Sequence, residues 1–439
     1  MSVLADIYNV FDPSPLPANS PLYVECKEVR GDSDVLVELG RKIERSNVPT
    51  CQLYSGHRGC GKSTELLRLA DDLDRKGCKV VYFAVDAKDQ GDVNPEDVEY
   101  TDILLACTRH LLKDLEAADP QPIASWLKER WAELNDVLKT KVSVAELKAE
   151  VLVQQMAKIT ATIRAQPNQR HEIRKLLNPH TESLVVALNE FIKDAKGKLP
   201  PGKSKLVVIA DGLDKITLVT REGGRTNHDE VFIDRSTQLQ ALDCYVIYTV
   251  PISLVLSKRA SDLAEIYSCA PHVLPSIMVQ TQDNQPHEPG IEKLKDIVAS
   301  RVYSVEGTQG LNLETQVFDS PETLRQLCRI TGGHVRNLIL LMQLAIDYTD
   351  DQLPITATAL RQAIRKLRTA YRETVDANQW ALLAQVFRSK QIEHDEPHRS
   401  LLFSRCLLEY FEEDKWHDVH PILRDVPEFK QALDRLPSL

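Results

Sequence analysis

The sequence contains no apolar run that approaches the roughly 18 or more residues needed to cross a bilayer, which argues against a membrane-spanning protein. It also lacks a basic N-terminal stretch followed by an apolar core, so no signal peptide is recognised. The nine cysteines are odd in number and none has CxxC spacing, which argues against a disulfide framework and a zinc ribbon. We therefore expect a soluble protein of the reducing cytoplasm.

An excess of positive charge is also lacking. The 54 Lys and Arg residues are outnumbered by 64 Asp and Glu residues, which gives a net charge of −10 at pH 7. This balance favours solubility and provides no general attraction to nucleic acid or to an anionic membrane. With 43% apolar and 27% charged residues, the 439-residue chain has an ordinary globular composition and is long enough for two or three domains.

Short apolar segments alternate with helical patterns over the first two thirds of the chain. Such segments, four to eight residues long and separated by helices, predict a parallel sheet that is covered on both faces. The predicted fold class is therefore α/β. The segments predicted as strands are residues 50–56, 78–87, 205–216, 244–251 and 271–279.

A glycine-rich loop, "GHRGCGKST", follows the first predicted strand and precedes a helical pattern. It fits the pattern G-x-x-x-x-G-K-[ST], in which glycines let the backbone N–H groups surround a phosphate at a helix start. Lys62 would reach the β- and γ-phosphates, and Ser63 would bind Mg²⁺. A chance match in a glycine turn is the alternative, which the flanking strand and helix disfavour. The predicted nucleotide-binding residues are Gly56, Gly59, Gly61, Lys62, Ser63 and Thr64.

Polar residues at two predicted strand ends supply the other parts of a P-loop site. Asp211 follows five apolar residues and is predicted to hold the metal, although a buried strand that ends in an Asp-Gly turn is a common structural feature. Many P-loop ATPases carry Glu at the next position, which here is Gly212. Asp214 is the nearest substitute for orienting the attacking water, and slow turnover is expected if it fails. Thr249, at the end of the fourth strand, is predicted to contact the γ-phosphate or the water.

Three units are expected along the chain. Lys62 and Asp211 are 149 residues apart, and the excess length maps onto the helical stretch 110–198, which we interpret as an insertion. The basic residues of its "KITATIRAQPNQRHEIRKLL" run form either a solvated helix face or a contact surface for an acidic partner or a neighbouring subunit. The predicted units are a P-loop domain at 1–284, a helical lid at 285–375 and a winged-helix-like domain at 376–439.

Taken together, "GHRGCGKST", "VVIADGLDK", the polar strand end in "YVIYTVP" and the helical "TGGHVRNLILLMQLA" resemble the AAA+/STAND-type P-loop ATPases over residues 20–375. The resemblance implies ATP and Mg²⁺ as cofactors. "DGLDK" departs from the Asp-Glu pair of AAA+ proteins and is more similar to the STAND, NACHT and KAP branches, which include many regulatory switches. The pattern is also similar to bacterial AAA ATPases, and this implies a context in defence or signalling.

The resemblance also implies roles for arginines. Arg336 follows Gly332 and Gly333 and matches the lid arginine that senses the γ-phosphate; a surface arginine beside a helix cap is the alternative. AAA+ proteins usually complete their site with an arginine from the next subunit, which implies a homo-oligomer. Arg259 is the first candidate for that arginine and Arg235 the second.

The segment 376–439 is predicted to contain two helices and a hairpin whose turn is Glu412–Asp414. Origin-recognition ATPases end in a winged helix that binds DNA, but here eight Lys and Arg face twelve Asp and Glu from Asp376 onward. That balance disfavours nucleic acid and favours a protein partner. The hairpin residues Trp416, His417 and His420 are predicted to be packing residues, because two residues three apart on a strand face opposite sides.

The predicted function is a regulatory ATPase that uses its nucleotide state to control assembly or partner engagement. The alternative is a DNA-binding ATPase of the origin-recognition or transposition-regulator type, whose contacts would come from Arg365, Lys366 or Arg368 in the basic stretch 361–372. A scaffold with a merely structural nucleotide is a further alternative, suggested by Gly212 in the place of a glutamate.

Overall fold

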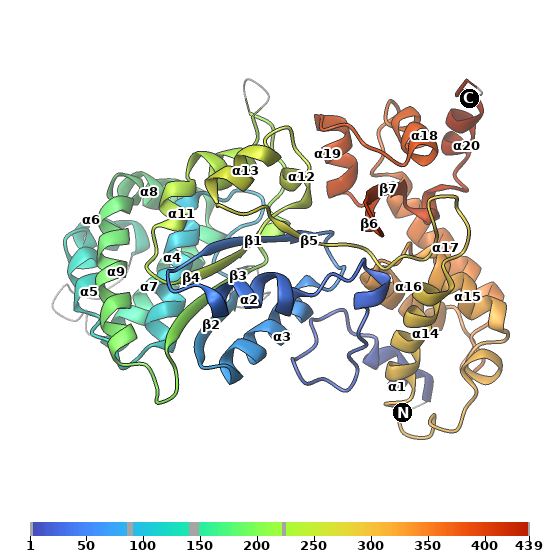
Figure 1. Cartoon of the computed structure of the whole chain (residues 1–439), viewed down its shortest axis with the longest axis horizontal. Coiled ribbons are helices and arrows are strands. Elements are labelled where there is room, and N and C mark those ends of the chain that lie inside the picture. The colour runs from blue at the N-terminus through green and yellow to red at the C-terminus, as the bar shows by residue number, and fades with distance from the viewer. Residues whose placement is uncertain (1–2, 86–90, 140–148, 222–224, 438–439) are drawn as a thin grey trace.

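The computed structural model describes residues 3–85, 91–139, 149–221 and 225–437 (Figure 1). The part of the predicted insertion at 140–148 and the end of the second predicted strand at 86–87 lie outside these residues. Within the described ranges, no helix combines the length and the apolar character needed to cross a membrane.

A five-stranded parallel sheet organises the N-terminal half of the chain (Figure 1). Its spatial order is β2-β3-β4-β1-β5, so β4 lies between β1 and β3. The third predicted strand ends at Asp211, because Gly212 turns the chain with a φ of 88°. The fifth is only three residues long, because Pro275, which follows it, has no N–H for the ladder. The strands are β1 (Cys51–Gly56), β2 (Cys78–Ala84), β3 (Lys205–Asp211), β4 (Tyr245–Thr249) and β5 (His272–Leu274).

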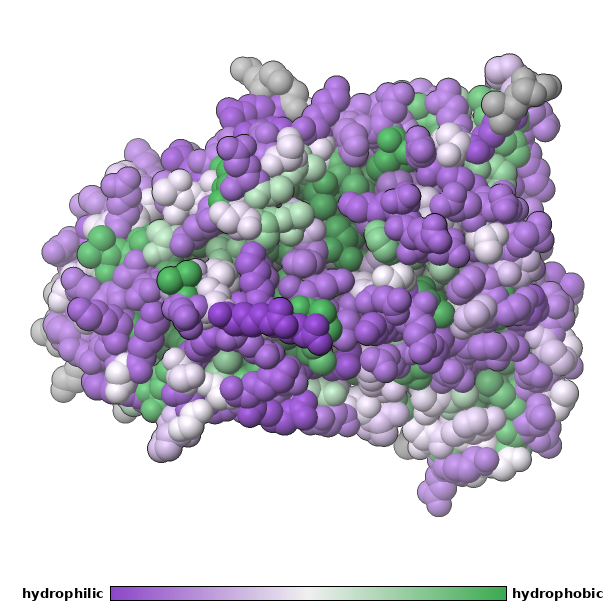
Figure 2. Space-filling model, in the orientation of Figure 1, coloured by the Kyte–Doolittle hydropathy of each residue, from purple (hydrophilic) through white to green (hydrophobic). Residues whose placement is uncertain are grey.

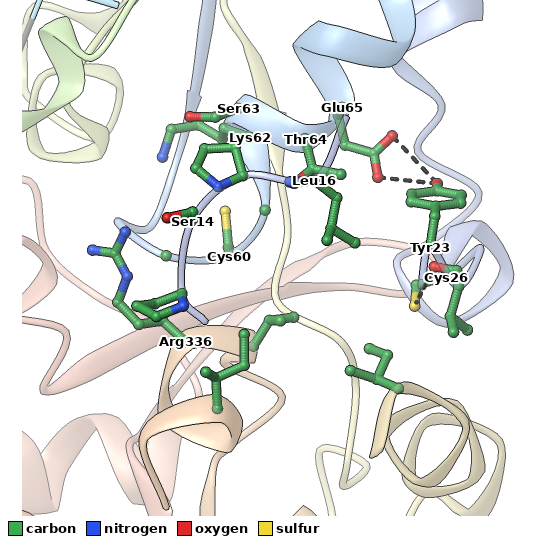
Figure 3. Close-up of a pocket in the computed structure, with 18 of the residues that line it drawn as sticks. Ser14, Leu16, Tyr23, Cys26, Cys60, Lys62, Ser63, Thr64, Glu65 and Arg336 are labelled. Atoms are coloured by element: carbon green, nitrogen blue, oxygen red, sulfur yellow. Dashed lines mark hydrogen bonds between the residues drawn. The ribbon is translucent and has the colours of Figure 1, made fainter. Parts of the chain in front are cut away.

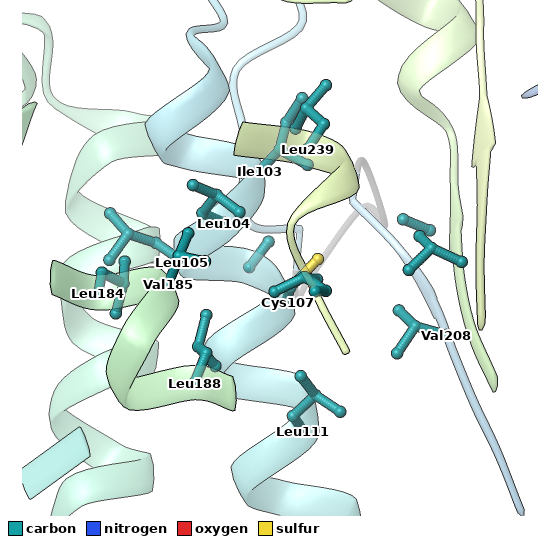
Figure 4. Packing of buried hydrophobic residues seen from close by; sticks show 14 of the residues in the cluster. Ile103, Leu104, Leu105, Cys107, Leu111, Leu184, Val185, Leu188, Val208 and Leu239 are labelled. Atoms are coloured by element: carbon teal, nitrogen blue, oxygen red, sulfur yellow. The ribbon is translucent and has the colours of Figure 1, made fainter. Parts of the chain in front are cut away.

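Alternate residues of β3 point to opposite faces of the sheet. Val207 and Ile209 belong to a buried cluster with Leu66 of α3 (Lys62–Arg75). Val208 belongs to the larger cluster on the other face, together with Leu111 of α4 (Tyr100–Asp114) (Figure 4). Both faces are therefore covered, which confirms the predicted α/β fold class. The short helices of this part are α2 (Arg41–Arg45), α10 (Asn227–Asp229), α11 (Ser236–Gln240), α12 (Ile252–Val255) and α13 (Ala260–Ile266).

A helical layer separates β2 from β3 in the sequence and packs beside the sheet (Figure 1). Two of its basic residues do not form a solvated face. Arg170 and Arg174 are only 4% and 6% exposed; both pair with Asp97, and Arg174 also pairs with Asp102. These two arginines hold α8 against the start of α4. The further helices are α5 (Gln121–Lys128), α6 (Trp131–Leu138), α7 (Ala149–Ala165), α8 (Pro167–Leu177) and α9 (Thr181–Gly197).

Four helices, which we call the lid helices, follow the sheet. Their core also contains Leu4, Ile7 and Phe11 from the N-terminal end of the chain. Helix α1 (Val3–Val10) contacts both α14 and α16, so residues 3–11 pack with the lid helices instead of with the sheet (Figure 1). The lid helices are α14 (Glu288–Val302), α15 (Pro321–Ile330), α16 (Val335–Asp347) and α17 (Ala357–Arg372).

The segment from residue 376 to residue 437, which we call the tail, contains the predicted hairpin. Strands β6 and β7 pair antiparallel around Glu412–Asp414, and Tyr410 lies opposite Trp416. Trp416 is 2% exposed and its ring stacks on that of Tyr410 at 4.5 Å, which confirms the prediction that it is a packing residue. The tail elements are α18 (Trp380–Ser389), α19 (Glu396–Phe403), β6 (Leu407–Phe411), β7 (Lys415–Val419) and α20 (Pro427–Asp434).

The molecular face in Figure 2 is mostly hydrophilic, with hydrophobic residues in smaller areas. Large hydrophobic side chains that are exposed are few among the described residues. They are Val3, Val37, Val48, Val186 and Tyr348.

Candidate nucleotide-binding site

The glycine loop, residues 56–63, connects β1 to α3. Gly56, Gly59 and Gly61 have φ values of 140°, 87° and 113°, which side-chain-bearing residues rarely adopt. A Cβ atom on Gly59 would lie 2.6 Å from the Cβ of Arg336, so only glycine permits this approach of the lid. The glycine pattern read from the sequence therefore corresponds to a tightly curled loop at a helix start, as phosphate binding requires.

Lys62 is the first residue of α3 and is 4% exposed. Its Nζ donates to the carbonyl oxygens of Gly56 at 2.8 Å and His57 at 2.9 Å, and lies 2.8 Å from Asp214 Oδ2. Burial alone would lower the pKa of Lys62, but the Asp214 carboxylate outweighs burial and the pKa is raised. The ammonium group is therefore charged and held inside the curl of the loop.

Asp211 lies beside the first hydroxyl of α3. Its Oδ2 accepts a hydrogen bond from the Tyr82 hydroxyl at 2.8 Å and its Oδ1 accepts from the Gly212 N–H at 2.7 Å, and the Ser63 side chain lies close enough to lower the pKa of this carboxyl. Burial, and then the neighbouring Asp214, raise the pKa of Asp211. The structure thus brings together Ser63 and Asp211, the two residues predicted to hold the metal. Tyr82 was not predicted, because nothing in its own segment indicates a partner on β3.

Asp214 follows β3 on a short 3-10 turn, Leu213–Lys215, and is 4% exposed. Burial would raise its pKa, but the Lys62 ammonium overcomes that effect and lowers it. Thr249 supports this turn, since its Oγ1 accepts from the Leu213 N–H at 3.0 Å. Thr249 is 0% exposed, and its Oγ1 also donates to the Ala210 carbonyl of β3 at 3.5 Å. Its predicted contact with a γ-phosphate therefore gains no support from this geometry.

A cavity of about 150 Å³ lies between the glycine loop, the lid helices and residues 13–26 (Figure 3). Residues 13–26, which we call the leader, form a wall of this cavity. The Leu16 N–H donates to Thr64 Oγ1 at 3.1 Å, and the Tyr23 hydroxyl donates to Glu65 at 3.1 Å. Because the leader lacks periodicity, no sequence pattern indicated that it would lie against α3.

Arg336 lines the same cavity from the start of α16. Its backbone N–H donates to the Gly59 carbonyl at 3.1 Å, and the His334 Nε2 lies 2.5 Å from the Arg58 carbonyl. The guanidinium group of Arg336 has no hydrogen-bond acceptor or ion-pair partner among the described residues. In Figure 3 the side-chain nitrogens of Lys62 and Arg336 lie toward the same end of the cavity. The structure thus brings the predicted lid arginine to the glycine loop.

The two arginines predicted to act on a neighbouring subunit lie elsewhere. Arg259 pairs with Asp262 at 3.1 Å and with Asp234 at 3.3 Å and is about one third exposed. The guanidinium of Arg235 lies over the Tyr100 ring at 5.0 Å. Neither lines the cavity of its own chain, so both stay predictions for an intersubunit contact.

The tail contacts the glycine loop directly, which was not predicted. The Glu409 N–H of β6 donates to His57 Nε2 at 2.9 Å, and the guanidinium of Arg58 lies 4.0 Å from the centre of the Phe403 ring in α19. The Tyr410 hydroxyl donates to the Gly332 carbonyl at 2.7 Å. The loop, the start of α16 and the tail hairpin therefore meet at one junction.

The histidines of this junction are packing residues. His420 is 0% exposed, and its Nε2 lies 2.8 Å from the amide nitrogen of Asn337. His417 Nε2 lies 3.4 Å from Glu409 Oε2 on the opposite strand. Within the described residues, no group of three or more His, Cys, Asp or Glu side chains is placed to hold a metal ion.

No protein-family model and no curated protein matches the sequence. Among solved structures, the chain is similar to the ORC2 protein of Aeropyrum pernix in ADPNP–ADP complexes, with 11% identity, coverage of 97% of this chain and 96% of that one, and a TM-score of 0.43. The Aeropyrum pernix ORC1 protein in complex with DNA has 14% identity, coverage of 94% and 95%, and a TM-score of 0.36. Cdc6p of Pyrobaculum aerophilum has 12% identity, coverage of 97% of both chains and a TM-score of 0.35.

At these TM-scores the assignment of the fold rests on the chain's own geometry. A parallel sheet with β4 inserted between β1 and β3, a glycine loop after β1 and an aspartate at the end of β3 define a P-loop fold of the additional-strand type. With helices that follow the sheet and dock an arginine on the loop, the chain has the fold of an AAA+ P-loop ATPase. The predicted resemblance is confirmed at this level.

Proposed function

We propose that this chain binds Mg²⁺–ATP at the glycine loop, hydrolyses it and uses its nucleotide state to control assembly or the engagement of a partner. The observation that carries the proposal is the buried Lys62–Asp214 ion pair, which lies beside the Ser63–Asp211 contact at the start of α3. A lysine inside a glycine loop with an adjacent hydroxyl and carboxylate is the set of groups that a phosphate chain and its metal need.

Each of these residues has a separate part in the proposed mechanism. Lys62 would bind the β- and γ-phosphates, while Ser63 and Asp211 would hold Mg²⁺. The metal ion, when bound, neutralises charge on the phosphate oxygens. Asp214 is ionised at neutral pH because Lys62 lowers its pKa, so its carboxylate can accept a hydrogen bond from the attacking water and orient it. Arg336 contacts the γ-phosphate from the lid.

The contacts of the glycine loop support a role as a switch. The Gly59 carbonyl accepts from Arg336, the Arg58 carbonyl contacts His334, and His57 accepts from Glu409 of the tail. A shift of the loop between nucleotide states would therefore move the lid and the tail together. We propose that this movement changes a surface recognised by a second copy of the chain or by a protein partner in the cytoplasm, and, by analogy alone, that the protein acts in defence or signalling.

DNA is the second candidate partner. Helix α17 presents Arg361, Arg365 and Lys366 as exposed residues, and these favour DNA contact. Arg368 and Arg372 of the same helix instead pair with tail residues Asp425 and Glu428, which reduces the free positive charge. DNA retention at low salt that is lost in Arg365→Ala and Lys366→Ala would establish this alternative.

The test of the proposed function compares ATP binding by the wild type and by Lys62→Ala, using calorimetry with Mg²⁺ present. We expect Lys62→Ala to abolish binding, because the variant loses the cation that faces the phosphates. Lys113→Ala removes an exposed lysine of α4 and serves as the matched control with wild-type affinity. Undiminished ATP binding by Lys62→Ala would refute the proposal.

A further inference from the structure

Arg301 is a buried arginine in the wall that the lid helices contribute to the cavity. It lies on α14, one turn after Ile297, and is 4% exposed. Its Nη1 donates to the Ile297 carbonyl of the same helix at 3.2 Å, whereas its Nε is buried without a hydrogen-bond partner. No carboxylate in the described ranges forms an ion pair with it.

Arg30, which also lines the cavity, is similar to Arg301, because it donates only to the Cys60 carbonyl at 2.7 Å and its Nε is buried without a hydrogen-bond partner. Arg174 instead pairs with Asp97 and Asp102. Burial of a guanidinium group without such partners is unfavourable, and burial is the sole cause that lowers the pKa of Arg301. The last turn of α14 is a favourable position for a cation, but only one of the Arg301 donors has an acceptor there. Arg301 thus lines the cavity and carries a buried N–H donor that has no acceptor among the described residues.

The surroundings of Arg301 distinguish its end of the cavity from the phosphate end. The lining contributed by α14, α16 and the leader includes the apolar side chains Leu22, Val24, Ile297 and Ile339. Helix α14 is tied to the leader there, since the Ser300 hydroxyl donates to the Leu22 carbonyl at 3.3 Å. No other charged group perturbs the pKa of Arg301, whereas Lys62 and Asp214 perturb one another at the loop.

We propose that Arg301 reads the nucleobase, by donating an N–H to a ring nitrogen on the edge of adenine while the apolar side chains pack on the ring faces. Apolar walls with a few placed polar groups are typical of small-molecule sites. A guanidinium group offers only donors, and adenine carries the ring acceptors N3 and N7. This inference rests on the proposed nucleotide binding and adds the residue that distinguishes a nucleotide from a bare phosphate chain.

The test measures the binding of ATP and of inorganic tripolyphosphate by calorimetry, with Mg²⁺ present. In Arg301→Met we expect ATP to bind roughly ten- to a hundredfold more weakly, as for the loss of a charged donor, and tripolyphosphate to bind within about twofold of the wild type. Arg329→Met, which removes an exposed arginine of α15, is the matched control and is expected to bind both ligands as the wild type does. Arg301→Gln serves as a second variant if Arg301→Met does not fold.

Three results would overturn the inference. An equal loss for tripolyphosphate would place Arg301 on the phosphates, and unchanged ATP binding with a lowered Tm would give it only a structural role. A deficit that disappears when 2′-deoxy-ATP replaces ATP would assign the contact to the ribose. If the wild type binds neither ligand, the proposed function itself fails, an outcome that the wild-type titration alone identifies.

Discussion

Asp211 is the last residue of β3 and Asp214 lies on the turn that follows, yet the surroundings of these identical side chains shift their pKa values in opposite directions. Burial and the proximity of Asp214 raise the pKa of Asp211, whereas the Lys62 ammonium lowers that of Asp214. Groups whose pKa values are moved apart in this way are suited to different tasks in one site. The sequence indicated both residues by their position after an apolar strand, but not which of them would pair with the loop lysine.

The variant Asp214→Asn tests the task proposed for Asp214. It removes the negative charge but keeps the side-chain shape, so we expect kcat for ATP hydrolysis to fall by roughly 10²-fold or more. ATP affinity should stay the same or rise, because the phosphates no longer compete with Asp214 for Lys62. Phosphate release and calorimetry measure the two effects, and Asp376→Asn, an exposed change in the tail, is the control. An unchanged kcat would contradict the assignment.

At the scale of the elements, the strands and turns that depend on neighbouring residues in the sequence were predicted well. Strands β1, β3 and β4 and the hairpin β6–β7 follow from local apolar runs and turns, and the loop that follows β1 carries its own glycine signature. The predicted nucleotide-binding and metal residues lie together because the carboxyl ends of parallel strands meet at one sheet edge.

Contacts that depend on distant partners could not be predicted. The ion pairs of Arg170 and Arg174 join residues more than 70 positions apart. The local sequence pattern therefore indicated only a charged helix. The leader has no periodicity, and its place on the cavity follows from the packing of α1 with α14 and α16. Arg301 likewise lies in a helix whose local pattern does not indicate that this residue is buried.

The glycines that precede α16 fix how the lid meets the sheet, and Gly333→Ala tests this. A Cβ at Gly333 would lie 1.7 Å from the Ile277 carbonyl oxygen, and φ is 76°. The backbone conformation alone costs about 1–2 kcal/mol for alanine, and the clash adds to it. We therefore expect a lowered Tm and weaker ATP binding, because the start of α16 would have to move away from the glycine loop to relieve the clash.

The matched control is Gly310→Ala, where nothing lies within 4 Å of the added Cβ. It is expected to retain the wild-type Tm and ATP affinity. Equal behaviour of the two variants in thermal denaturation would show that the docking of α16 does not depend on Gly333.

At the scale of the whole molecule, three buried histidines join the glycine loop, the lid and the tail. His57 accepts from the Glu409 N–H, His334 from the Asn337 N–H and His420 from the Ile422 N–H. Each ring therefore needs one unprotonated nitrogen. Burial is the main cause that holds the pKa of all three well below 6.5, and neighbouring positive groups add to it.

These histidines predict that the protein loses stability in mild acid. They are neutral in the folded state, but in the unfolded chain they bind protons below about pH 6.5. The free energy of unfolding should therefore fall as the pH drops from 6.5, by up to ~1.4 kcal/mol per pH unit for each imidazole. Thermal denaturation between pH 7.5 and 5.5 measures this as a falling Tm below 6.5. A Tm that stays constant over that range would mean that the rings tolerate protonation.

The central claim is that the nucleotide state is transmitted from the glycine loop to the lid and the tail. The most direct measurement is amide hydrogen exchange of the wild type and Lys62→Ala with Mg²⁺ and either ADP or a non-hydrolysable ATP analogue. We expect the ATP analogue, but not ADP, to change protection at residues 331–337 and 407–411 of the wild type, with no change in Lys62→Ala. Identical exchange in both nucleotide states of the wild type, with the analogue demonstrably bound, would contradict the account.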